Sequence, residues 1–214
     1  MRRAAIALLI RRPDRAAELL QAVEAKTLNK GDLAAEHWSQ LKQNPNRAIA
    51  SRAVRLSERG DNNATGREEI VLKLLPLAKD KGDAARGKEV FTVNCAVCHT
   101  FDGAGKNVGP DLTGIGARER SDILMEILDP NRSVEANYRA WTVTTKDDES
   151  ISGRLESETQ TAVEILDTTA TKHIIQRKDI KSLTVSPLSI MPTGFEALPP
   201  EDLKAVLEYL TAKP

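Results

Sequence analysis

The sequence has few cysteines, no net charge and no long apolar run, and each absence excludes a class of protein. Only two cysteines occur among 214 residues, three positions apart, which excludes a fold held together by many disulfides. Lys plus Arg and Asp plus Glu are equal at 31 each, so the basic excess of a general nucleic-acid binder is missing. No apolar run approaches the roughly 20 residues of a membrane helix. We therefore expect no nucleic-acid partner and no membrane span.

The chain is long enough for one large domain or two small ones. Its first apolar stretch, residues 4–10, ends at Arg11 and Arg12, and such charges do not fit the core of a secretory signal peptide. A helical pattern then starts abruptly. We therefore expect the sequence to be a fragment of a longer chain.

Residues 1–80 place apolar side chains at helical spacing in four short segments. The segment NPNRAIASRAVRL resembles one HEAT-type repeat, so HEAT-like helical pairs and a plain small bundle both stay open. His37 is expected on the surface of these helices. The composition of residues 79–83 (KDKGD) is that of a linker, which predicts a boundary between a helical domain 1–80 and a second domain 83–214.

Residues 138–186 alternate apolar and polar side chains, a period typical of strands. Five short strands are predicted, as a small Sm- or SH3-like barrel or as a simple meander. Helical patterns flank this stretch: Asp83 is expected to cap a helix ending at Asn94, and a last helix is expected from Pro199. The predicted fold is mainly α with a β insertion.

The segment Cys95-Ala96-Val97-Cys98-His99 is the motif most indicative of chemistry. Two thiols at this spacing can form thioether bonds to a haem, and the adjacent histidine can bind the iron from one side. A Cys-x-x-Cys redox pair and half of a zinc site are the alternatives. Zinc would need further ligands, and the remaining histidines, His37 and His173, are distant in sequence. Haem attachment is therefore favoured.

Residues 83–137 and 186–214 resemble a class I cytochrome c, through GDAARGKEVFTVNCAVCHTFDGAGKNVGPDLTGIG and the final LKAVLEYL. The wider arrangement is similar to the haem-binding C-terminal module of large planctomycete and verrucomicrobial multidomain proteins. The resemblance implies one covalent haem c held by Cys95, Cys98 and His99. It further implies that Pro110 packs on the haem and that Met191 is the distal iron ligand. Met125 is expected in the core, and His173 in a strand with a structural or solvated role.

The resemblance implies an electron-transfer module, not an enzyme, that serves a fused or partner dehydrogenase in the periplasm or at the cell surface. Two other functions stay open. Met191 could dissociate in a haem-based sensor or enzyme for small ligands. The helices and strands could form an interaction scaffold in which the haem is structural.

Overall fold

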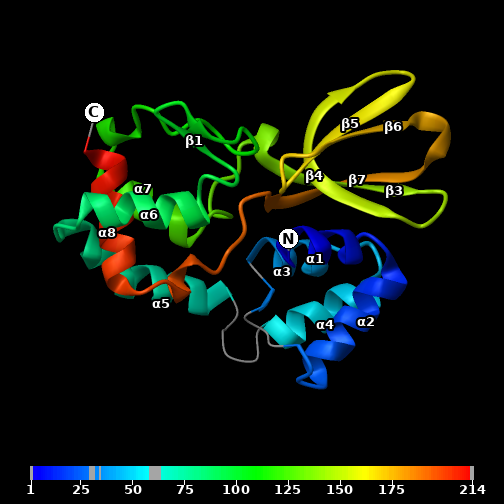
Figure 1. The fold of residues 1–214 in the computed structure, drawn as a ribbon, viewed down its shortest axis with the longest axis horizontal. Coiled ribbons are helices and arrows are strands. Elements are labelled where there is room, and N and C mark those ends of the chain that lie inside the picture. The colour runs from blue at the N-terminus through cyan, green and yellow to red at the C-terminus, as the bar shows by residue number, and fades with distance from the viewer. Residues whose placement is uncertain (1, 29–31, 34, 58–63, 213–214) are drawn as a thin grey trace. The chain divides into compact units, whose positions relative to one another are not determined.

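The computed structural model describes residues 2–28, 32–33, 35–57 and 64–212 (Figure 1). They form two compact units. The helix–sheet unit comprises Met1–Asp61 and Val134–Pro192, and the helical unit comprises Asn62–Ser133 and Thr193–Pro214. These units group the residues differently from the predicted domains 1–80 and 83–214, whose boundaries stay a prediction. No helix in the described residues is long and apolar enough to cross a membrane.

Four helices form the front of the helix–sheet unit: α1 (Arg2–Ile10), α2 (Pro13–Glu24), α3 (Ala35–Lys42) and α4 (Arg47–Ser57). Apolar side chains from all four form one core, which includes Ile10, Leu20, Leu41 and Ile49. The expectation that His37 lies on the surface was wrong, because its side chain is on the inner face of α3 and is only 1% exposed. A HEAT-type pairing of these helices stays a prediction.

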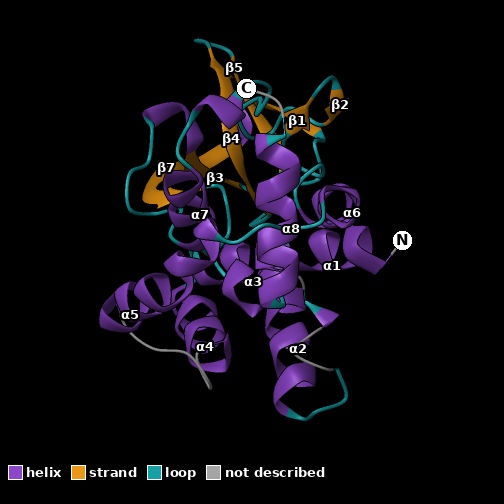
Figure 2. Cartoon of the chain, turned by 90° about the vertical axis from the view of Figure 1, so that its left-hand side faces the viewer, coloured by secondary structure: helices purple, strands orange, loops and turns teal. Residues whose placement is uncertain are grey.

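Five antiparallel strands complete this unit (orange in Figure 2): β3 (Arg139–Thr145), β4 (Ser150–Glu158), β5 (Ala162–Asp167), β6 (Lys172–Gln176) and β7 (Ile180–Ser189). The predicted strand pattern is therefore present. The order across the sheet is β6-β5-β4-β3-β7. Alternate side chains share one face, where Val143, Val163 and Ile165 are fully buried, as the period of two requires.

The barrel alternative was wrong, because the sheet does not close: β6 and β7 are its edges, and no ladder joins them among the described strands. Where β6 ends, the Arg177 amide donates to the carbonyl of Thr161 at 2.9 Å, so the chain stays bonded to the start of β5. The next strand then pairs with β3 on the opposite edge. A four-strand meander extended by β7 describes the sheet.

The helical unit contains α5 (Ala64–Leu74), the 3-10 turn η2 (Leu75–Lys79), α6 (Ala84–Asn94), α7 (Arg120–Leu128) and α8 (Pro200–Thr211). Two short strands, β1 (Thr100–Phe101) and β2 (Ala104–Gly105), and the 3-10 turns η3 (Ile115–Ala117) and η6 (Phe195–Ala197) connect them. The predicted cap of α6 is confirmed: the Asp83 carboxylate accepts from the amides of Ala85 and Arg86 at 2.8 and 3.2 Å. The last helix buries its predicted face, with Leu203, Val206, Leu207 and Leu210 as core residues.

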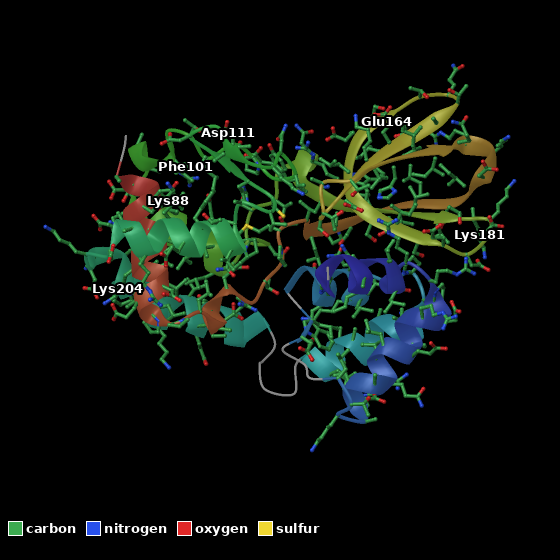
Figure 3. All side chains as sticks on the ribbon, in the orientation of Figure 1. Lys88, Phe101, Asp111, Glu164, Lys181 and Lys204 are labelled. Carbon is green, nitrogen blue, oxygen red and sulfur yellow. The ribbon has the colours of Figure 1, made fainter. Side chains whose placement is uncertain are left out.

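The crossing of α6 and α8 is the centre of this unit. A Cβ atom on Gly87 would lie 2.0 Å from the carbonyl oxygen of Ala205, so the two backbones touch there. Beside this crossing, Phe91, Phe101 and Tyr209 form a cluster with ring centroids 5.0–5.8 Å apart (Phe101 is labelled in Figure 3). The cluster places the end of α6, and with it the CAVCH segment, on a rigid base.

Candidate functional site

The CAVCH segment forms a tight turn that continues α6. The Cys95 amide still donates to the carbonyl of Phe91 at 2.8 Å, as in the helix. The amides of Cys98 and His99 then both donate to the carbonyl of Cys95, at 2.9 and 2.8 Å. The two cysteines and the histidine are therefore presented from a single hydrogen-bonded turn.

A glycine-rich loop is bonded to this turn through the backbone. The amides of Val108 and Gly109 donate to the carbonyl of Cys98 at 2.9 and 2.7 Å, and the Lys106 amide donates to Ala96 at 3.1 Å. The loop starts from a two-residue hairpin turn at Asp102 and Gly103, both with positive φ, which matches the preference of such turns for Asp-Gly. The loop thus covers one side of the His99 ring.

The orientation of His99 is fixed by the backbone of Pro110. Nδ1 of His99 lies 2.9 Å from the Pro110 carbonyl oxygen, and since a carbonyl only accepts, Nδ1 carries the proton and donates. Burial lowers the pKa of His99, although the Pro110 bond acts in the opposite direction. The imidazole is therefore neutral, with its lone pair on Nε2, the form in which histidine binds a metal.

Gly109 allows the imidazole to occupy this position. A Cβ atom at residue 109 would lie 2.6 Å from Cε1, 2.8 Å from Nδ1 and 3.0 Å from Nε2 of His99. Any side chain there would displace the ring. The sequence led us to expect that Pro110 packs on a haem. It did not lead us to expect that the Pro110 carbonyl accepts a hydrogen bond from His99, or that Gly109 leaves room for the ring. The consecutive Gly-Pro pair was the only local feature of the sequence that marked this position.

The two cysteines are thiols in the structure, not a disulfide. Burial, with a smaller contribution from Cys98, raises the pKa of Cys95 to about 12. Reactive redox cysteines have a lowered pKa, so this environment does not favour the redox-pair alternative. The described parts of the chain contain no group of three or more His, Cys, Asp or Glu side chains that could hold a metal ion. A zinc ion at the two cysteines would therefore find no further ligands among the described residues.

Downstream of the turn, Asp111 fixes the path of the loop (labelled in Figure 3). Its carboxylate accepts from the Thr113 amide at 2.8 Å and from the Thr113 hydroxyl at 2.7 Å, and these bonds lower the pKa of Asp111. The Asp102 amide donates to the same hydroxyl at 3.0 Å. Asp111 and Thr113 thereby tie the hairpin to the segment that carries Pro110.

Four of the predicted site residues, Cys95, Cys98, His99 and Pro110, thus belong to one hydrogen-bonded segment of the helical unit. Met191 follows β7 and is grouped with the helix–sheet unit, and its role as a ligand stays a prediction. Two adjacent thiols and a neutral imidazole with Nε2 left for a metal are the donor set that a covalent haem requires. The residues of the helical unit therefore fit a haem c.

Comparison with known proteins agrees with this donor set. Residues 84–158 match the family model of cytochrome c, so this part of the chain is a cytochrome c domain, and Cys95 and Cys98 are both present in it. The chain is 43% identical over 49 residues to a cytochrome c-553-like protein of Synechocystis sp., which covers 22% of this chain and 46% of that protein. It is 38% identical over 45 residues to a cytochrome c of Cochliobolus lunatus, 21% of this chain and 42% of the relative. The chain thus spans less than half the length of these curated relatives.

The matched region and the compact units have different limits. The match runs through α6 and α7 into β3 and β4, which are part of the sheet. Helix α8, which packs against α6, lies beyond it. The family implies a covalently bound haem c, and the domain is of a kind typically found outside the cytoplasm.

Proposed function

We propose that the chain is a c-type cytochrome module that carries single electrons through one haem c, with His99 and Met191 as axial ligands. It serves a fused or partner dehydrogenase, in the periplasm or at the cell surface, and does not itself transform a substrate. Its form is that of the haem-binding module of planctomycete and verrucomicrobial multidomain proteins. The observation that carries the proposal is the 2.9 Å hydrogen bond from His99 of the CAVCH turn to the carbonyl of Pro110 in the loop that follows.

The residues of the helical unit have distinct parts in this function. Cys95 and Cys98 would hold the haem through two thioether bonds, which would keep it attached to the end of α6. Pro110 keeps the proton of His99 on Nδ1 and thereby leaves Nε2 as the ring nitrogen that would bind the iron. A haem bound in this way supplies reversible one-electron chemistry, whose potential is tuned by the axial ligands, burial and hydrogen bonds.

Met191 is proposed as the distal ligand from the sequence. It precedes Pro192 and Gly194 in a short segment before the last helix, where the resembling family has its ligand methionine. The other methionine considered, Met125, lies in α7 with its sulfur against the guanidinium of Arg132, which supports its assignment as a non-ligand. A thioether ligand raises the potential relative to a second histidine.

Expression with a c-type maturation system tests the proposal. The intact chain should retain its haem through acid-acetone extraction, and Cys95→Ala with Cys98→Ala should release it.

Met191→Ala should lower the reduction potential, abolish the sulfur-to-iron charge-transfer band of the oxidised protein and open the iron to carbon monoxide. Met125→Ala is the matched control and should change none of the three. A haem that extracts fully from the intact chain would refute haem c, and rapid carbon monoxide binding by the intact reduced protein would favour the ligand-sensing alternative.

A further inference from the structure

An ion pair of low exposure holds the segment that follows Met191. Nη1 of Arg67, on α5, lies 2.7 Å from Oε1 of Glu196, and the two side chains are only 22% and 11% exposed. The same nitrogen donates to the carbonyl of Leu128, the last residue of α7, at 3.3 Å. Arg67 therefore links three elements of the helical unit: α5, the end of α7 and the turn η6.

The second oxygen of Glu196 shapes the turn itself. Oε2 accepts from the amide of Gly194 at 3.1 Å, and the Ala197 amide donates to the Gly194 carbonyl at 3.2 Å. Gly194 has φ of 119°, a conformation open mainly to glycine. The chain direction at Gly194 is thus set by Glu196, whose carboxylate is in turn held by Arg67.

The tether from this turn to Met191 is short. Three peptide units separate Gly194 from Met191, and an extended chain covers at most about 3.6 Å per residue. At most about 11 Å of extended chain therefore connects Met191 to Gly194, whose backbone direction depends on the ion pair. A change in the path at Gly194 is transmitted to the backbone that carries the thioether.

We infer that Arg67 and Glu196 are positioning residues for the distal ligand, an inference that rests on the proposed function of Met191. The ion pair holds the turn at 194–197 in one conformation, and this turn limits the paths open to the preceding segment that carries Met191. Arg67 lies outside the predicted domain 83–214 and outside the family match at 84–158, so the helix before the cytochrome domain is part of its ligand control.

The effect of replacing Arg67 follows from the carboxylate of Glu196, which remains without its partner. Removal of Arg67 leaves the Glu196 carboxylate shielded from water without its cation, which disfavours the present turn. The methionine-bound state then competes less well with external ligands. We expect imidazole to bind the oxidised protein about tenfold more tightly, equivalent to about 1.4 kcal/mol.

The experiment compares Arg67→Gln, Arg67→Lys and Glu196→Gln in the intact, haem-loaded chain. Imidazole affinity, reduction potential and the sulfur-to-iron charge-transfer band are measured, with thermal unfolding followed in parallel. Arg120→Gln is the matched control, because it removes a part-buried ion pair to Glu208 (26% and 30% exposed) in the same unit. The Arg120 guanidinium also donates to Thr211 and to the carbonyls of Ala78 and Asp80, none of which belongs to the turn at 194–197. Glu196→Gln keeps an oxygen for the Gly194 amide while removing the charge, so it remains informative if Arg67→Gln does not fold.

We expect methionine ligation to be weaker in Arg67→Gln and Glu196→Gln. Arg67→Lys should keep at least part of the ligation strength of the intact protein, and Arg120→Gln should keep all of it. If the intact protein shows the charge-transfer band and the variants keep it with unchanged imidazole affinity, the inference is wrong and the proposed function stands. If the intact haem protein lacks the band, Met191 ligation and this inference fail together. Equal losses in Arg120→Gln would show a general effect of stability and overturn the specific role.

Discussion

Gly87 of α6 and Ala205 of α8 are in backbone contact: a Cβ atom on Gly87 would lie 2.0 Å from the Ala205 carbonyl oxygen and 2.7 Å from Cβ of Tyr209. Neither neighbour is the flexible end of a side chain, so neither can give way without a shift of the helix. The crossing that supports the CAVCH turn depends on this glycine.

Gly87→Ala should therefore destabilise the helical unit by about 1–3 kcal/mol, the usual range for an overpacked core. The sign of this change in stability is informative, because alanine is a better helix former than glycine by about 1 kcal/mol and would stabilise the helix at an uncrowded site. Chemical unfolding of the haem protein, followed by the haem absorbance, measures the change. Glu89→Ala, on the exposed face of the same helix, should have little effect. An unchanged or higher unfolding midpoint for Gly87→Ala would show that α6 and α8 are not in close contact.

Gly109→Ala should disturb His99 without altering the thioether bonds. The added methyl would lie within 3.0 Å of three ring atoms, so the imidazole must turn away and lose its bond to Pro110. We expect covalent haem to be retained, with at least a tenfold lower apparent affinity of the histidine for iron, since supporting contacts of a metal-bound histidine have about this effect.

The measurement is the fraction of low-spin oxidised haem as imidazole is added to replace the lost ligand. Gly103→Ala is the control, because a Cβ atom there meets nothing within 4 Å and only the local cost of a positive φ remains. Equal spectra for the two variants would contradict the role assigned to Gly109.

The sequence predicted the parts of this molecule whose signals are local. The cap at Asp83, the strands between residues 138 and 186 and the buried face of the last helix each follow from spacing within one element. The motif at Cys95, Cys98 and His99 is equally local. By contrast, the hydrogen bond from His99 uses a backbone carbonyl, which every residue possesses, so no residue type marks it.

What the sequence could not provide are relationships between distant segments. The pairing of β7 with β3 depends on register across a whole meander, and the pattern alone left barrel and meander open. The burial of His37, which is 1% exposed, depends on what packs against α3 in the folded unit, and the spacing within one helix does not reveal that. The ion pair between Arg67 and Glu196 joins residues that are 196 − 67 = 129 positions apart in the sequence. With 62 charged side chains in the chain (31 basic and 31 acidic), the sequence does not reveal which of them meet.

Asp167 should make the helix–sheet unit sensitive to acid. Its side chain is buried, which acts to raise its pKa, but hydrogen bonds from Thr169, His173 and Thr171 outweigh burial and lower the pKa overall. Arg11 adds an ion pair at 2.7 Å. Because the folded pKa lies below the unfolded value of about 3.9, this stabilisation is complete above that value and is lost as the pH falls through the folded pKa.

Asp167→Asn should therefore lower the free energy of unfolding of this unit at neutral pH, by about 1–3 kcal/mol, and weaken its loss below about pH 4. Both tryptophans, Trp38 and Trp141, belong to this unit, so their fluorescence in urea follows its unfolding. Asp14→Asn is the control, because it removes the charge of a side chain that is 62% exposed. It should leave the difference between the free energies of unfolding at neutral and at acid pH unchanged. Parallel pH curves for the protein and Asp167→Asn would contradict the assignment.

The sheet should be removable without loss of haem attachment, although the helices before it should not survive the change. Its two ends meet, since the Ile190 amide donates to the Tyr138 carbonyl at 2.8 Å, so a short Gly-Ser linker can replace residues 139–189. The front helices contact the sheet through Arg11, whose carbonyl accepts from the Ser150 amide at 2.6 Å, and through Gln40, which donates to Thr168 at 2.7 Å.

We expect the shortened chain to keep haem through acid-acetone extraction, because all elements of the helical unit remain. In the shortened chain, Trp38 should emit as a solvent-exposed tryptophan, although it is only 8% exposed in the complete unit. The reason is that helices α1 to α4 lose the sheet against which they fold. The full-length variant Trp141→Phe is the control, because it reports Trp38 alone in the presence of the sheet. Loss of haem attachment would show that the strands complete the cytochrome core, and a buried Trp38 signal would show that residues 1–57 fold independently of the sheet.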